Sequence, residues 1–208
     1  FLTNYTLPKL SSLKDNWEYN LELSVNLRFL IFIIVPLMVM IFTFKSLVIK
    51  IFYSDKFIQA EDLFLFQLIG DLFRSLAALF GLWLIPRVKI KQLILIDLLF
   101  NISYFLLPNF LFYIIGNNLK IISISYMIAF FFHFVLYFIY TKIELKFTLS
   151  ETLIRNIFLS ILLISSTFVI SEYIKSYSYY LNVILIFTWS WFILQSNERE
   201  SLLKKIFK

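Results

Sequence analysis

One apolar stretch, residues 63 to 85, is long enough to cross a membrane and carries two opposite charges near its middle. At 3.6 residues per turn, Gln67, Asp71 and Arg74 fall on one narrow stripe of a helix. A charge in mid-bilayer costs about 2.5 to 3.5 kcal/mol even on the lenient insertion scale, so such residues usually face a bundle interior or a water-filled cavity. The small residues beside the stripe, which let a neighbouring helix come close, are Gly70, Ala77 and Gly81.

Apolar runs of membrane length recur along the chain, and 61% of the 208 residues are hydrophobic. This pattern predicts an all-α, polytopic transmembrane helix bundle with about six spans. Four spans are expected at 21–42, 63–85, 92–115 and 121–140, and two additional ones lie within 153–194. The remaining segments are expected to be a cytoplasmic loop (1–20), a cytoplasmic linker (141–152) and a cytoplasmic tail (195–208).

Most of the 19 Lys and Arg residues fall in the segments on one side of these spans. The side richer in Lys and Arg is normally cytoplasmic, so both termini are expected in the cytoplasm. The net charge of +6 is therefore attributed to membrane orientation, and no nucleic-acid module is visible. The chain begins at Phe1 without a methionine or a signal-peptide pattern, which indicates a fragment that lacks an N-terminal part.

Several kinds of chemistry are excluded by composition. The absence of cysteine excludes thiol catalysis, thiolate metal sites and disulfides, and one histidine leaves no two-histidine metal site. Paired-carboxylate loops, glycine-rich phosphate cradles and a serine with a nearby base are also missing. We therefore expect neither an enzyme nor a bound metal or cofactor.

The end of the first span has two interpretations. Phe44, Leu47, Val48, Ile51 and Phe52 repeat with the spacing of one helix face, while the lysines between them point away. This pattern favours an interfacial amphipathic helix. A straight extension of the first span is equally compatible with it.

Asp71 and Arg74 stand three residues apart and can pair within their helix, which lowers the cost of burying both. In the functional interpretation, Arg74 binds an anionic head group, Asp71 is its gate or a proton carrier, and Gln67 lines the same site. In the structural interpretation, the pair only fixes helix packing.

Two further polar residues lie inside predicted spans. Asp97 stands a few residues inside the third span, where an interfacial position is more typical than a coupling-ion site. His133 lies in the fourth span, where a packed, hydrogen-bonded side chain is more typical than a proton relay. Both are retained as weak candidates for binding a coupling ion.

Residues 5 to 140 resemble the C-terminal half of O-antigen and enterobacterial-common-antigen translocases. The resemblance rests on Tyr5-Thr-Leu-Pro8-Lys-Leu-Ser11, on Ser54-Asp55-Lys56-Phe57, and on the run from Leu63 through Gln67, Gly70 and Asp71 to Arg74. These proteins are flippases of lipid-linked oligosaccharide in the multidrug/oligosaccharidyl-lipid/polysaccharide exporter superfamily. Residues 141 to 208 fall outside the similarity, and their two spans look like those of the fourteen-helix members.

The resemblance implies a bacterial inner-membrane transporter with two lobes around a central cavity and alternating access. Its cargo would be an undecaprenyl-pyrophosphate-linked oligosaccharide, and its partners membrane lipids, an N-terminal lobe, and the polymerase and chain-length regulator of the pathway. Two alternatives stay open: a membrane-embedded polymerase or glycosyltransferase of the same pathway, and a lipid II or drug exporter of the same superfamily.

Overall fold

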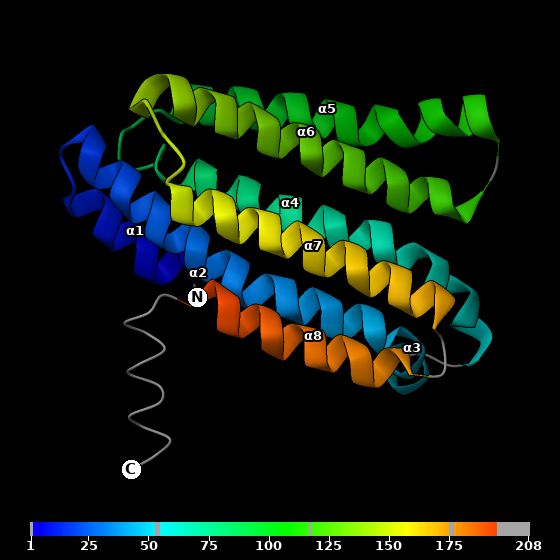
Figure 1. Cartoon of the computed structure of the whole chain (residues 1–208). Helices are drawn as coiled ribbons and strands as arrows, with labels where there is room; N and C mark the ends of the chain where they lie inside the picture. Colours follow the sequence, from blue (N-terminus) through cyan, green and yellow to red (C-terminus); the bar gives the residue numbers. More distant parts are fainter. Residues whose placement is uncertain (1, 53–54, 117, 175–176, 195–208) are drawn as a thin grey trace, which may run out of the picture.

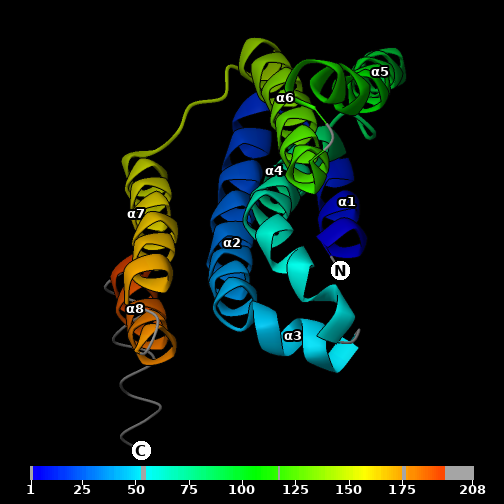
Figure 2. The ribbon, with the colours of Figure 1, turned by 90° about the vertical axis from the view of Figure 1, so that its right-hand side faces the viewer.

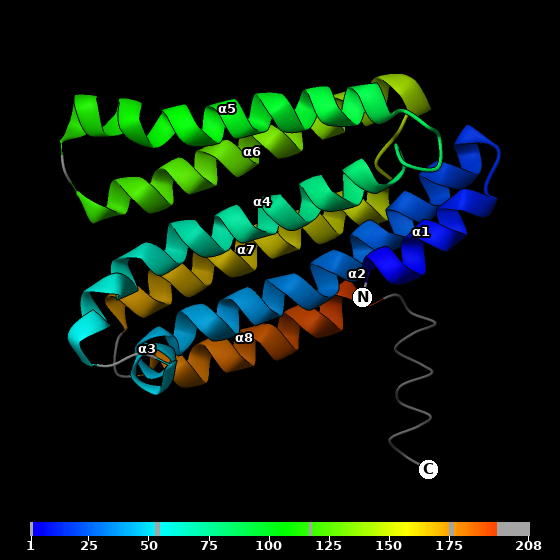
Figure 3. The same cartoon turned by 180° about the vertical axis from the view of Figure 1, so that it is seen from behind.

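The long helices lie side by side along one direction, as Figures 1 and 3 show from opposite sides. The computed structural model describes residues 2–52, 55–116, 118–174 and 177–194, and no strand occurs within them. The expected all-α helix bundle is confirmed. The elements are α1 (Leu2–Ser12), α2 (Asn16–Thr43), α3 (Lys45–Phe52), the 3-10 helix η1 (Asp55–Leu63), α4 (Phe64–Leu82), α5 (Ile90–Ile115), α6 (Leu119–Leu145), α7 (Glu151–Tyr173) and α8 (Ser178–Ile193).

Five of the described helices are long and apolar enough to cross a membrane: α2, α5, α6, α7 and the continuous segment Ala60–Leu82 that contains α4. The sixth, α8, is apolar but has 16 residues. At 1.5 Å per residue it is about 24 Å long, which is shorter than the bilayer core of about 30 Å. The bundle thus contains five full-length candidate spans and one shorter apolar helix.

The bundle has two parts that meet at α2. Helix α6 packs against α4 on one side and α5 on the other, and α2 contacts α4. The α7–α8 pair packs on α2, and Figure 2 shows it on the side of α2 away from α4, α5 and α6. An apolar cavity of about 370 Å³ lies where α2, α4, α6 and α7 approach one another.

The N-terminal segment differs from the sequence prediction, which placed a loop over residues 1–20. Residues 2–12 form α1, because Thr6 and Leu10 are fully buried against the rest of the bundle. Helix α2 already begins at Asn16, since Asp15 and Glu18 form a capping box that satisfies its first backbone N–H groups. On which side of the membrane this segment lies stays a prediction.

Of the two alternatives for residues 44–52, the straight extension of the first span is wrong. The chain turns at Phe44, and α3 is a separate helix of eight residues rather than an extension of α2. Figure 2 shows α3 running across the end of the bundle, away from the axis of α2. Whether it lies in a membrane interface stays a prediction.

The small residues of α4 allow the close approach that the sequence predicts. Gly70, Ala77 and Gly81 are all buried. A Cβ atom added at Gly70 would overlap the ring of Tyr126 on α6, and one added at Gly81 would come within 3.1 Å of Tyr137. Helix α6 therefore lies against the glycine side of α4, and the polar stripe falls beside this contact.

Candidate functional site

The polar stripe of α4 remains partly uncovered by the other described helices. Gln67 and Arg74 are exposed, and Asp71 is half-buried. Because the stripe adjoins the glycine side of α4, the edge of α6 borders it while its outer part stays open. An open charged surface in a membrane span needs either water or a further protein surface beside it.

Asp71 takes its partner from α6 and not from its own helix. The Tyr126 hydroxyl donates a hydrogen bond of 2.5 Å to Asp71 Oδ1. Within the described residues, no ion pair of 4.0 Å or less joins Asp71 to Arg74, so the pairing within the helix that the sequence allowed is not made. The Arg74 guanidinium instead lies 5.7 Å from the centre of the Phe130 ring.

Asp71 and Arg74 both interact with Tyr126 of α6. The carboxylate of Asp71 is held by the Tyr126 hydroxyl, and the Arg74 guanidinium interacts with the same hydroxyl while its side chain stays exposed. The guanidinium is planar and permanently charged, and its donors match phosphate oxygens in pairs. The stripe can therefore bind an anionic group at Arg74 while Asp71 stays anchored.

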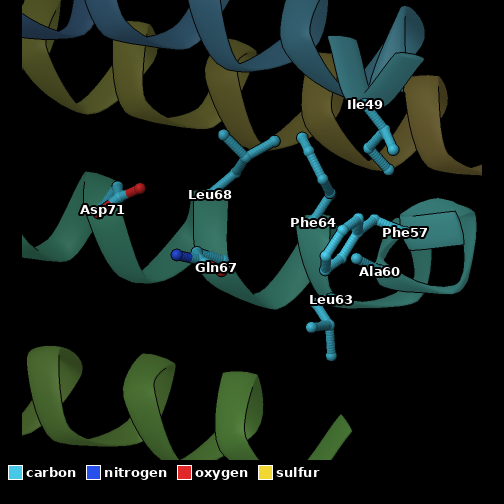
Figure 4. A pocket seen from close by; sticks show the side chains of 8 residues that line it. All are labelled: Ile49, Phe57, Ala60, Leu63, Phe64, Gln67, Leu68 and Asp71. Atoms are coloured by element: carbon cyan, nitrogen blue, oxygen red, sulfur yellow. The ribbon is translucent and has the colours of Figure 1, made fainter. Parts of the chain in front are cut away.

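A cavity adjoins the stripe toward α3. It has a volume of about 280 Å³ and is formed by α3, η1 and the first half of α4. Figure 4 shows Gln67, Leu68 and Asp71 on α4, with Ile49 and Phe57 contributed by the preceding elements. The wall is mainly apolar, with Gln67 and Asp71 as its polar members.

The weaker candidates, Asp97 and His133, come together at the contact of α5 with α6. His133 Nε2 lies 3.0 Å from Asp97 Oδ1, and the Tyr137 hydroxyl donates to the same oxygen at 2.7 Å. Asp97 is therefore not an isolated interfacial carboxylate. His133 is packed and hydrogen-bonded, and its ring stacks on Phe100 with centroids 4.1 Å apart.

The sequence interpretation missed Tyr126 and Tyr137, which hold the two aspartates. Both lie on α6, at seven residues before and four residues after His133, and this spacing places all three on one helical stripe. Phe130 falls on the same stripe. A search of the fourth span for hydroxyls in register with His133 would have found both tyrosines.

Comparison with known proteins gives one limited similarity. The chain is 28% identical over 109 residues to a protein named Lipid III flippase from Escherichia coli K12, and equally to one of that name from Shigella flexneri. The aligned part is 50% of this chain but 26% of each relative, so the chain spans about a quarter of their length. No family model and no solved structure matches.

Proposed function

We propose that this chain is part of a flippase that moves a lipid-linked oligosaccharide across the bacterial inner membrane. The observation that carries the proposal is the open charged stripe of α4, where Arg74 is exposed in a membrane-length helix. The similarity to two proteins named Lipid III flippase supports a cargo of the same class. The cargo would be an undecaprenyl-pyrophosphate-linked oligosaccharide, such as an O-antigen or related repeat unit.

In this proposal the stripe faces the central cavity between two lobes. Arg74 binds the pyrophosphate, because its fork of donors suits phosphate oxygens. Gln67 contacts the cargo beside it, and Asp71 is held by Tyr126 until the cavity rearranges. The second wall of the cavity would be an N-terminal lobe, and transport would proceed by rocking of one helix bundle against the other.

The proposed orientation has both ends of the sequence in the cytoplasm. It rests on the excess of Lys and Arg on the side of the membrane that contains Arg87 and the segment around Glu144, because the side richer in these residues is normally cytoplasmic. The polymerase and chain-length regulator of the pathway would act on the exported cargo from the opposite side. A role in transport is favoured over the polymerase or glycosyltransferase alternative because both relatives are named as flippases.

The test is export of surface polysaccharide by cells that carry variants at the natural chromosomal locus. We expect Arg74→Ala to abolish export and Arg74→Lys to retain part of it, since lysine keeps the charge but loses the fork. Removal of one buried or half-buried charge also harms folding, so the amount of protein in the membrane is measured alongside.

The matched control is Asn109→Ala on α5, an exposed amide that bonds only to its own helix and should leave export unchanged. The decisive variant combines Asp71→Asn with Arg74→Gln. If that protein is present at the normal level and still exports sugar chains, the stripe is neither cargo site nor gate. Accumulation of a drug or of lipid II in place of the oligosaccharide carrier would favour the other exporters of the superfamily.

A further inference from the structure

A second polar cluster lies apart from the α4 stripe, at the contact of α5 with α6. Asp97 stands seven residues after the first residue of α5, Ile90, and about 10 Å from it along the helix. Its Oδ1 atom is bonded to His133 at 3.0 Å and to the Tyr137 hydroxyl at 2.7 Å. The Asp97 side chain is 42% exposed, whereas that of His133 is 13% exposed.

We propose that Asp97 and His133 form a proton-binding site that is loaded and unloaded as the protein works. In the empty state, before the added proton binds, Asp97 and His133 together carry one net negative charge. After one proton binds, their net charge is zero. The coupling of this proton to transport rests on the proposed function, whereas the binding of the proton does not.

The hydrogen bonds define where the added proton goes. An ionised Asp97 accepts at Oδ1, so His133 must carry its hydrogen on Nε2 in the empty state. The other ring nitrogen, Nδ1, is then a bare acceptor, and it is buried with no hydrogen-bond partner in the described part of the chain. A hydronium ion transfers its proton to Nδ1: one of its O–H bonds breaks, an N–H bond forms, and water leaves an imidazolium beside the carboxylate.

The arrangement suits a proton and not a metal ion. Both neighbours of Asp97 Oδ1 direct hydrogen atoms toward it, so a cation at that oxygen would meet two donors in place of ligands. Among the described residues there is no group of three or more His, Cys, Asp or Glu that could hold a metal ion.

Burial of the ring acts most strongly on His133 and disfavours its charged form, and Asp97 is the charged group that acts on it in the opposite direction. From α6, Tyr137 contacts the same oxygen, and from α5, Tyr104 lies beyond the Phe130 ring. The charged side chains of α4 are Asp71, held by Tyr126, and Arg74, which packs on Phe130. A change of charge at His133 is therefore felt first through Asp97.

The packing of the cluster connects it to the α4 stripe. Phe100 covers one face of the His133 ring, so access to Nδ1 requires α5 to shift against α6. Tyr137 bonds to Asp97 on one side and lies against Gly81 of α4 on the other. Loading of the site can thus change how α5 sits on the α4–α6 pair that carries Arg74.

The direct test uses the protein produced from its own gene, labelled with ¹⁵N-histidine and held in nanodiscs. The ¹⁵N chemical shifts report which ring nitrogens carry hydrogen, and His133→Gln identifies the resonance. We expect hydrogen on Nε2 alone near pH 8 and on both nitrogens near pH 5, which brackets the ordinary range of histidine. In Asp97→Asn the midpoint should fall by about one to three pH units, because the neighbouring negative charge is lost.

An imidazole that stays neutral across this range in the wild-type protein would overturn the proposal. So would an equal midpoint in Asp97→Asn, or a midpoint that follows sodium concentration. Asn101→Ala is the control, since this exposed amide on α5 bonds only to the backbone of Asp97 and leaves the carboxylate unchanged.

The coupling is tested in membrane vesicles that import labelled lipid-linked oligosaccharide under an imposed pH difference. We expect His133→Gln to lose the dependence on that difference, and wild-type transport that ignores the difference would overturn the coupling. If instead the proposed flippase function is wrong, Arg74→Ala should transport as well as the wild-type protein. Arg74→Ala should instead lose transport while its His133 still titrates.

Discussion

Two helix contacts in this bundle are built in opposite ways. The contact between α4 and α6 joins glycines to tyrosine rings and includes buried polar bonds, such as that of Trp83 Nε1 with Thr141 Oγ1 at 2.8 Å. The contact between α2 and α7 borders an apolar cavity of about 370 Å³, and Asn156 is buried in α7 with both amide atoms unpartnered among the described residues. We therefore expect the first contact to hold one geometry and the second to permit several.

This difference indicates which parts move together. Close packing with satisfied polar bonds favours a single arrangement, so α4 and α6 should behave as one rigid unit. The α7–α8 pair reaches the rest of the bundle mainly through α2 and should be able to shift.

Gly70→Leu should have the greatest effect, because its first side-chain atom would overlap the Tyr126 ring and come 3.3 Å from the Met127 Cα atom. Overpacking of this kind typically costs about 1–3 kcal/mol and here also pulls Tyr126 from Asp71. Thermal unfolding in detergent measures the loss. Ala78→Leu, an exposed position on the same helix, is the control and should change little.

Thr141→Val should lower stability by about 1–3 kcal/mol, since it leaves the buried Trp83 indole N–H without its acceptor. The exposed Thr188→Val, which loses only a bond to its own helix, is the comparison. Equal midpoints of unfolding for the two variants would mean that the polar bond does not distinguish the α4–α6 contact.

Asn156→Leu should have the opposite sign and raise stability by up to about 1 kcal/mol, because it removes two buried polar atoms that lack partners. The measurement is again the midpoint of unfolding, with Asn109→Leu at an exposed site of α5 as control. A loss of stability at Asn156 would show that this amide has a partner in the membrane, and the contrast between the two contacts would fail.

Lys89→Gln should give the smallest effect. The Lys89 ammonium lies 2.8 Å from Glu144, and this hydrogen-bonded carboxylate raises the pKa of Lys89 above its usual value. Because the pKa is raised, the stabilisation is complete below about pH 10.4 and is lost as pH rises through the folded value. This half-buried pair should also lose much of its effect at high salt, and a difference that persists there in full would contradict this explanation.

The sequence predicted the membrane helices and the polar stripe, because hydropathy and the 3.6-residue period are local properties. It did not predict that Asp71 would bond to Tyr126 instead of pairing with Arg74, since that choice depends on the register of α6 against α4. The meeting of Asp97 with His133 likewise depends on two helices.

The N-terminal helix α1 also depends on contacts between residues far apart in the sequence, which local sequence patterns do not predict. Residues 2–12 are polar enough to suggest a loop, and they form a helix that buries Thr6 and Leu10 against the bundle, where Thr6 bonds to Asn26, 20 residues later. Asp15 followed three residues later by Glu18 is the sequence pattern of a capping box, and it predicts that α2 begins at Asn16 and not at Leu21.

The hydrogen bond between Asp71 and Tyr126 can form only late in synthesis of the chain, because its partners are separated by 55 residues and by the whole of α5. At about 5–20 residues per second, a ribosome makes that length in roughly 3 to 11 s. For that interval α4 holds its carboxylate in the membrane before the hydroxyl that binds it has been synthesised. We expect slower synthesis between α4 and α6 to lengthen the time in which the carboxylate lacks its hydroxyl partner.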